Sequence, residues 1–265
     1  METDFLFATV LSDDILPFFV RGLKLTVLPV LARKDHYVMV TSGEILEAGD
    51  EAASDWVKKA ERIFSQNSKD EDMSAQNRLN YQSLLTLQDP SAHFVVLYNK
   101  SGTNISAAYL AWSKDWSVDD LQVKGFVAES VTYRIYTRTE DEALYLIGVL
   151  NSTVVNKAIK PYQTEGVYHG KRDIHRRPFE VCPIPEFNAE NPVHQEIVKF
   201  SKSAKKTIEK WGPEMQGGLA NVREKTRTLI DDQIKKIDSL VESLFNTTEG
   251  PVASDQKKTG QSLMF

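Results

Sequence analysis

A strand pattern gives way to a helix pattern within the stretch Phe126-Val-Ala-Glu-Ser-Val-Thr-Tyr-Arg-Ile-Tyr-Thr-Arg-Thr-Glu-Asp-Glu-Ala-Leu-Tyr-Leu-Ile-Gly-Val-Leu150. Val131, Tyr133 and Ile135 alternate with the residues between them, which predicts a strand over 126–136. Thr139 and Glu142 then have the spacing of a capping box, which predicts a helix through Leu150. The chain therefore contains both a sheet and helices that can cover it.

The N-terminal side of this stretch adds further strand patterns and one amphipathic helix. The strand at 94–98 is continuously apolar, as in a strand buried on both faces. We predict strands at 25–31, 36–40, 94–98 and 105–112, turns at 32–35 and 101–104, and a helix at 54–66. The pattern predicts an α+β fold, with a mixed, mainly antiparallel sheet, flanking helices and long C-terminal helices.

The C-terminal side is mainly helical. A short helix that Pro161 stops, a loop and an apolar strand at 181–184 are expected to follow Leu150. Asn191-Pro192 then predicts the start of a helix that ends near Lys210. A last helix is expected at 219–245, with Ile230, Ile234, Ile237, Val241 and Leu244 at the spacing of a heptad seam. Because this seam covers only two heptads, packing on the chain's own domain is favoured over a coiled coil with a partner.

These patterns predict three parts: an α+β recognition domain at 1–190, a helical segment at 191–246 that packs on it, and a disordered tail at 247–265. No apolar run approaches the roughly 20 residues of a membrane span. The N-terminus lacks the pattern of a secretory signal. The single cysteine, Cys182, excludes an internal disulfide and fits a reducing compartment. We expect a cytoplasmic protein.

Positive charge is concentrated in one segment of an acidic chain. The segment is Gly166-Val-Tyr-His-Gly-Lys-Arg-Asp-Ile-His-Arg-Arg-Pro-Phe-Glu-Val-Cys-Pro-Ile-Pro185, and the net charge of the whole chain is -5. Residues 157–177 hold six basic and two acidic residues, whereas residues 44–72 hold nine acidic and four basic ones. This asymmetry indicates a directed contact with an anion, although two solvated faces would give the same pattern.

The order of residues around this segment resembles a known family. The shared blocks are Leu150-Asn-Ser152, Val154-Val-Asn156, Ile159-Lys-Pro161, Gln163-Thr-Glu-Gly166, Arg172–Glu180 and Pro183–Phe187. They resemble the C-terminal, TaqI-like specificity region of N6-adenine DNA methylases of restriction-modification systems. The block Tyr98–Ala108 supports the resemblance and Asp14–Phe18 does so more weakly. The resemblance covers most of residues 10–245 and is specific over 140–188.

The motifs of methyl transfer itself are missing. Neither a glycine-rich turn for S-adenosylmethionine nor an Asn/Asp-Pro-Pro-Tyr/Phe loop for a flipped adenine is present; Asp89-Pro90 is the nearest candidate. His169, His175, Cys182 and His194 match no zinc spacing. We therefore expect no enzyme activity, no metal and no cofactor in this chain. The resemblance implies a separate S-adenosylmethionine-dependent domain, which we expect to precede this chain in a longer protein.

Cationic and polar loop residues are the candidates for contacts with double-stranded DNA. Arginines and lysines can neutralise phosphates, and an arginine can instead read guanine. The candidates are Lys171, Arg172, His175, Arg176, Arg177, Tyr168, Gln163, Thr164, Ser101, Thr103 and Asn104. Structural roles remain open at each position: Asp173 could pair with an arginine, Ile174 and Phe179 could anchor the loop, and 101–104 could be a plain turn.

The resemblance implies a DNA-binding target-recognition domain that positions duplex DNA for a methyltransferase domain or subunit, with no membrane partner. A second hypothesis is a protein-interaction module whose helices at 192–210 and 219–245 dock a partner subunit, while the acidic face at 44–72 repels DNA. Trp56, Trp112 and Trp116 are expected in the core rather than as stacking platforms for bases.

Overall fold

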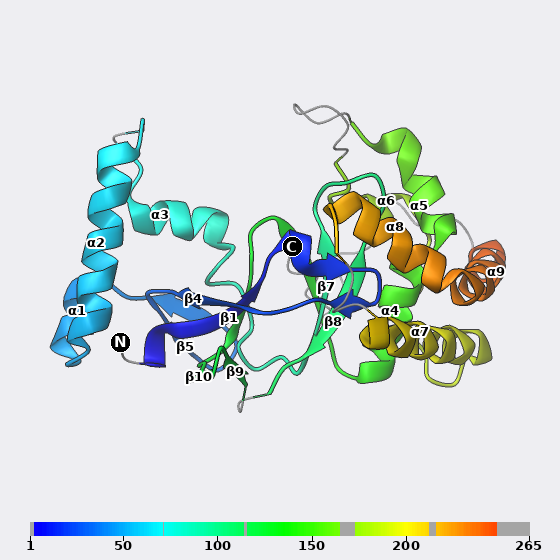
Figure 1. The fold of residues 1–265 in the computed structure, drawn as a ribbon, viewed down its shortest axis with the longest axis horizontal. Helices are drawn as coiled ribbons and strands as arrows, with labels where there is room; N and C mark the ends of the chain where they lie inside the picture. Colours follow the sequence, from blue (N-terminus) through cyan, green and yellow to red (C-terminus); the bar gives the residue numbers. More distant parts are fainter. Residues whose placement is uncertain (1–2, 71, 114–115, 165–172, 212–215, 248–265) are drawn as a thin grey trace.

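The computed structural model describes residues 3–70, 72–113, 116–164, 173–211 and 216–247, and the fold is α+β as predicted (Figure 1). An antiparallel sheet with the order β12-β7-β8 lies near the middle of the molecule. Its strands are β7 (Phe94–Asn99), β8 (Ala107–Ala111) and β12 (Thr132–Thr137). The strand predicted at 94–98 is confirmed, and Val95 to Tyr98 are buried on both faces of the sheet.

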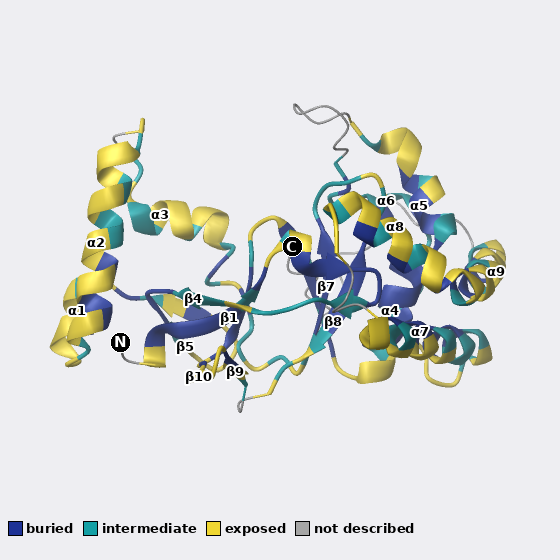
Figure 2. Cartoon of the chain, viewed as in Figure 1, coloured by how far each residue is buried: buried dark blue, intermediate teal, exposed yellow. Residues whose placement is uncertain are grey.

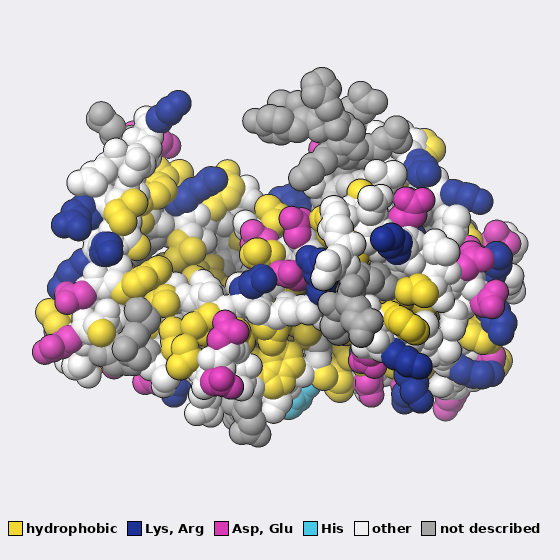
Figure 3. Space-filling model, in the orientation of Figure 1, with side chains coloured by type: hydrophobic (Ala, Val, Ile, Leu, Met, Phe, Trp, Pro, Cys, Tyr) yellow, Lys and Arg dark blue, Asp and Glu magenta, His cyan; other side chains and the backbone are white. Residues whose placement is uncertain are grey.

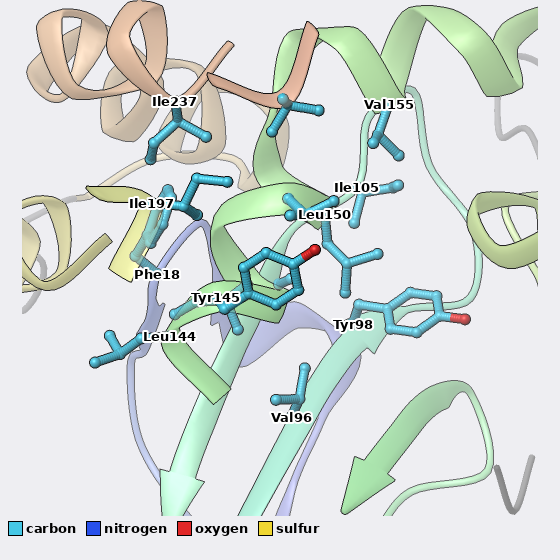
Figure 4. Close-up of a cluster of buried hydrophobic side chains, with 14 of the residues drawn as sticks. Phe18, Val96, Tyr98, Ile105, Leu144, Tyr145, Leu150, Val155, Ile197 and Ile237 are labelled. Atoms are coloured by element: carbon cyan, nitrogen blue, oxygen red, sulfur yellow. The ribbon is translucent and has the colours of Figure 1, made fainter. Parts of the chain in front are cut away.

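Helices cover one face of this sheet and share its hydrophobic core. Figure 4 shows Val96 of the sheet near Tyr145, in the hydrophobic cluster that also contains Tyr98, Ile197 and Ile237. Helix α4 (Glu140–Asn151) packs directly on the sheet, and α5 (Thr153–Ile159), α7 (Pro192–Trp211) and α9 (Asp231–Thr247) pack on α4. Helix α8 (Leu219–Leu229) lies next to α7 and α9. The most deeply buried parts of α4 and of the sheet lie against each other in Figure 2.

The predicted seam is buried in this cluster. Ile230, Ile234, Ile237, Val241 and Leu244 all belong to it. The chain's own domain therefore occupies the apolar face of the last helix, as we favoured from the sequence. The helix predicted at 219–245 is wrong in one respect, because α8 and α9 are separate helices that meet at Ile230.

The N-terminal residues form the other part of the molecule. Strand β1 pairs in parallel with β11 and antiparallel with β4, so this sheet is mixed. A second hydrophobic cluster joins it to the far face of the central sheet through Leu97 and Val95. The elements of this part are the strands β1 (Leu6–Val10), β4 (Lys24–Val27) and β11 (Phe126–Ala128), the hairpins β5–β6 (Val30–Ala32, Tyr37–Met39) and β9–β10 (Ser117–Val118, Leu121–Gln122), and the helices α1 (Ser42–Glu47), α2 (Glu51–Asn67) and α3 (Ala75–Leu79). The hairpin β2–β3 (Ile15–Leu16, Phe19–Val20) packs instead on β7 and β8 of the central sheet.

Two predicted strands are each two strands in the structure. The segment 25–31 divides into β4 and β5 around Leu28-Pro29, because proline has no N–H for a sheet ladder. The segment 126–136 divides into β11 and β12, which belong to different sheets. The helix predicted at 54–66 is confirmed within α2, but Trp56 is 40% exposed and does not belong to the core.

The strand predicted at 181–184 is wrong. Residues Arg177–Val181 form the short helix α6, with Pro178 in its first turn, where a missing N–H has no cost. Pro183 and Pro185 then prevent further helix and leave too few N–H groups for a strand. Cys182 is buried at the end of α6, not inside a strand.

The helix predicted from Thr139 is confirmed as α4, with a modified cap. The Thr139 hydroxyl accepts from the Glu142 N–H, as in a capping box. The Glu142 carboxylate instead accepts from the N–H of Arg138, one residue before the cap. Among the described residues, no helix has both the length and the apolar character needed to cross a membrane.

Candidate functional site

The loop after β7 is shaped by a buried amide. The Asn99 side chain is fully buried; its Nδ2 donates to the carbonyls of Ser101 (2.8 Å) and Asn104 (3.2 Å). Its Oδ1 accepts from the Ser106 N–H at 2.7 Å. Gly102 has a φ of +144°, which favours glycine, so residues 101–104 adopt the predicted turn. The Thr103 side chain at the tip is exposed, and Ser101 and Asn104 are half-buried.

The second candidate segment lies against this loop. Ser101 forms a β-bridge with Asp173, and the N–H groups of Ile174 and His175 donate to the Lys100 carbonyl at 2.9 and 3.1 Å. Ile174 is fully buried and anchors the segment, as the structural alternative expected. Two loops that are about 70 residues apart in the sequence therefore form one surface.

Gln163 and Thr164 connect the two loops. The Gln163 Nε2 lies 3.5 Å from the Gly102 carbonyl, and its Oε1 is buried without a hydrogen-bond partner among the described residues. The Thr164 hydroxyl donates to the Asp173 carboxylate at 3.0 Å. Gln163 thus has a buried acceptor that no described residue satisfies, whereas Thr164 holds the loop.

Asp173 and His175 form a local pair. The His175 Nε2 lies 3.5 Å from Asp173 Oδ1, and its Nδ1 lies 3.1 Å from the Tyr133 hydroxyl. His175 also has a φ of 45°, and its carbonyl accepts from the Tyr98 hydroxyl at 3.0 Å. Asp173 thus contacts Thr164 and His175, and Arg172, which the structural alternative could pair with Asp173, lies outside the described residues. Both ring nitrogens of His175 are thus already in contact with the protein.

Arg176 and Arg177 differ in their surroundings. The Arg176 guanidinium is hydrogen-bonded to the Tyr133 hydroxyl. Burial raises the pKa of Tyr133 above its ordinary value, and the positive charge of Arg176 offsets only part of this rise. Arg177 lies 3.1 Å from Glu180 one turn along α6, an exposed pair that contributes little stability. Such a pair can open at little cost when a phosphate competes for the arginine.

Three of the predicted contact residues, Tyr168, Lys171 and Arg172, lie outside the described residues, as does His169. The remaining eight lie in or next to the surface formed by the two loops. On the face in Figure 3, lysine and arginine side chains alternate with acidic ones, so positive charge does not cover the face uniformly.

A cavity of about 360 Å³ opens beside this surface. Most of the residues that line it belong to no motif of the sequence. Lys100 and Arg176 come from the two loops, and Arg134 comes from β12. Other lining side chains come from the N-terminal part: Leu28, Leu79, Gln82, Leu85, Gln88, Val127 and Glu129. The sequence does contain a sign that Arg134 lies away from the helix-covered core. Arg134 alternates with Tyr133 and Ile135, which pack in that core, so its side chain lies on the other face of the sheet.

Among the described residues, no group of three or more His, Cys, Asp or Glu side chains could hold a metal ion. No protein-family model and no curated protein sequence matches this chain. The resemblance to the specificity region of N6-adenine DNA methylases therefore stays a prediction from the residues themselves.

Proposed function

We propose that this chain binds double-stranded DNA as the target-recognition region of an N6-adenine DNA methyltransferase of a restriction-modification system. A separate domain or subunit would bind S-adenosylmethionine and transfer the methyl group. In this proposal the chain itself is not an enzyme and acts in the cytoplasm.

The adjacency of the two candidate loops carries the proposal. The candidate residues in 101–104 and in 163–177 lie in separate segments of the sequence, and hydrogen bonds from Ile174 and His175 to the Lys100 carbonyl bring the two segments together. Arg176 and Arg177 supply cations at one end of this surface, and Gln163 supplies an amide between the loops. Cations that contact phosphates and amides that contact base edges are the two groups that sequence-specific DNA recognition combines.

The roles follow from the surroundings of each side chain. Arg176 is held by Tyr133 at the edge of the cavity and would contact a phosphate or a guanine. Arg177 would exchange Glu180 for a phosphate. Thr103 at the exposed tip of the first loop would contact the backbone or a base edge. Asp173, Thr164 and His175 would keep the loop in shape.

The interaction-module alternative is less well supported. It requires an apolar face of the last helix that a partner could cover, and the seam from Ile230 to Leu244 lies in the chain's own core. Trp211 and Leu229 remain exposed at the ends of α7 and α8. These two separate side chains are too few for a subunit interface, because isolated exposed apolar residues are normal on a protein surface.

Salt-dependent binding to duplex DNA tests the proposal. We expect fluorescence anisotropy at 50 mM salt to detect binding to a random duplex, and the affinity to fall as salt rises. Replacing Arg176 and Arg177 with Ala should lower the slope of log K against log salt by about 2, one for each lost phosphate contact.

The matched control is Lys202→Ala with Lys206→Ala, which removes the same charge from exposed positions on α7. It should leave the slope nearly unchanged. Absence of binding at 50 mM salt, or an equal loss in both double variants, would contradict recognition by this surface.

A further inference from the structure

Arg134 is a buried arginine, whereas the other arginines of the described residues are half-buried or exposed. It lies in the middle of β12 opposite Leu97, and only 5% of its surface is exposed. Its Nε donates to the Tyr136 hydroxyl at 3.2 Å, but its Nη2 is buried without a hydrogen-bond partner. A buried guanidinium that keeps its charge needs partners for its donors. Arg134 therefore has a donor that the described part of the protein does not use.

The half-buried Arg223 and Arg227 show how this protein satisfies the guanidinium donors of arginines elsewhere. Arg223 donates to the carbonyls of Ser12 and Ile15. Arg227 donates to the carbonyls of Asn151 and Ile105. Both arginines connect α8 to other elements. Arg21 forms an ion pair with Asp14, and Arg177 forms one with Glu180. Arg134 forms no ion pair with a described residue.

The unused donor belongs to a side chain that lines the cavity. Lys100 and Arg176 line the same cavity, so three cationic residues contribute to its wall. Glu129 is the single acid in the lining, and its carboxylate accepts from the Ser12 N–H at 3.3 Å. The lining thus has a formal charge of +2, three cations against one acid, in a chain whose net charge is -5. This excess attracts an anion to a place where the molecule as a whole repels it.

The walls and the volume of the cavity indicate what the anion is attached to. Part of the wall is apolar and is formed by Leu28, Leu79, Leu85 and Val127. Gln82 adds an amide to it. A volume of about 360 Å³ is in the range of pockets that hold small ligands. Three cations favour a doubly charged phosphate over a carboxylate, and the arginine fork matches phosphate oxygens in pairs.

We propose that this cavity binds the phosphate of a nucleotide, with Arg134 as the buried phosphate ligand, Lys100 and Arg176 at its rim, and the leucine wall against the sugar or base. The nucleotide is either a free mononucleotide or one nucleotide of a nucleic-acid chain. This inference does not depend on the proposed function, because a pocket for a mononucleotide needs no duplex binding.

The test is calorimetry of the chain with 2′-deoxyadenosine 5′-monophosphate and with deoxyadenosine, which lacks the phosphate. We expect the monophosphate to bind at least tenfold more tightly than the nucleoside. Arg134→Met should weaken monophosphate binding at least tenfold, and Lys100→Met should weaken it less. Arg138→Met, which removes an exposed arginine, should leave binding unchanged.

Equal binding of the monophosphate and the nucleoside, no binding up to millimolar concentration, or equal binding by wild type and Arg134→Met would overturn the proposal. If Arg134→Met does not fold, two other measurements replace it. The proposal then requires that Lys100→Met binds the monophosphate more weakly than the wild type, and that the monophosphate raises the melting temperature of the wild type more than deoxyadenosine does. A 12-nucleotide strand without a terminal phosphate distinguishes the sources: displacement of the monophosphate indicates a nucleotide within a chain, and no displacement indicates a free mononucleotide.

Discussion

At the scale of single residues, buried amides hold the candidate site in place. Asn99 shapes the loop at 101–104. Asn156 Oδ1 accepts from the Ile105 N–H at 2.7 Å, and Asn151 bonds both the N–H and the carbonyl of Ala107. Asn151 and Asn156 belong to the blocks that carry the family resemblance. Their described contacts are structural, so part of the resemblance reflects how the loop is held rather than what it binds.

Asn99→Asp tests this structural role. Aspartate keeps the acceptor for the Ser106 N–H but replaces the donor to Ser101 and Asn104 with a buried, charged oxygen. We expect the free energy of unfolding to fall by about 2 kcal/mol or more, since buried groups without partners cost roughly 1–3 kcal/mol each. Urea unfolding measures the change, with the exposed Asn77→Asp as control. A loss as small as that of the control would contradict the role.

His194 gives the chain a pH-dependent contribution to stability. Burial lowers the pKa of His194 below its ordinary value of 6.5. Its Nδ1 accepts from the Asn188 N–H, and its ring stacks on Tyr145 at 4.5 Å between centroids. The unfolded chain therefore binds a proton near pH 6.5 that the folded chain does not bind. Stability is complete above pH 6.5 and decreases as the pH falls below it.

We expect wild type to lose more unfolding free energy than His194→Gln between pH 7.5 and 5.5, by at most about 1.4 kcal/mol per pH unit. Urea unfolding at several pH values gives both curves. Parallel curves would show that His194 contributes no pH dependence.

At the scale of elements, the sequence predicted those whose pattern is local. Thr139 marked the start of α4, the apolar run 94–98 marked β7, and Asn191-Pro192 marked the start of α7. Helix α6 was missed because five residues are too short to show a period, and the apolar Val181–Ile184 resembled a strand. The division of 126–136 was missed because sheet membership depends on partners that are distant in the sequence.

The close packing of α4 on α7 gives a prediction at this scale. A Cβ on Gly148 would lie 2.8 Å from Ile197 Cγ2 and would also meet the Ser201 hydroxyl. We expect Gly148→Ala to destabilise the protein by roughly 1–2 kcal/mol, since overpacking of roughly 1–3 kcal/mol exceeds the gain of about 1 kcal/mol in helix propensity. Thermal unfolding measures the effect.

Gly43→Ala is the matched control, because the nearest atom to its Cβ lies 3.8 Å away. Ser201→Ala should recover part of the loss, since the Ser201 Cβ lies 3.7 Å from the new methyl. No loss in Gly148→Ala would mean that α7 shifts freely and that the two helices do not pack tightly.

At the scale of the whole molecule, the cavity beside the candidate site is lined by residues of the central sheet and of the N-terminal part. The sequence placed residues 101–104 and 163–177 in separate loops and gave a basis for choosing both. The sequence could not show that one cavity is lined by Lys100, Arg134 and Arg176, because these residues come from three segments that only the fold brings together. It also could not show that Asp173 contacts Thr164 and His175.

Amide hydrogen exchange of the chain, alone and with saturating duplex DNA, tests the central claim most directly, because it locates the surface that the DNA covers. We predict slower exchange at 100–104 and 173–181 and unchanged exchange on the exposed face of α7. Protection confined to α7 and α9, or no protection anywhere, would contradict the proposal that the two joined loops bind DNA.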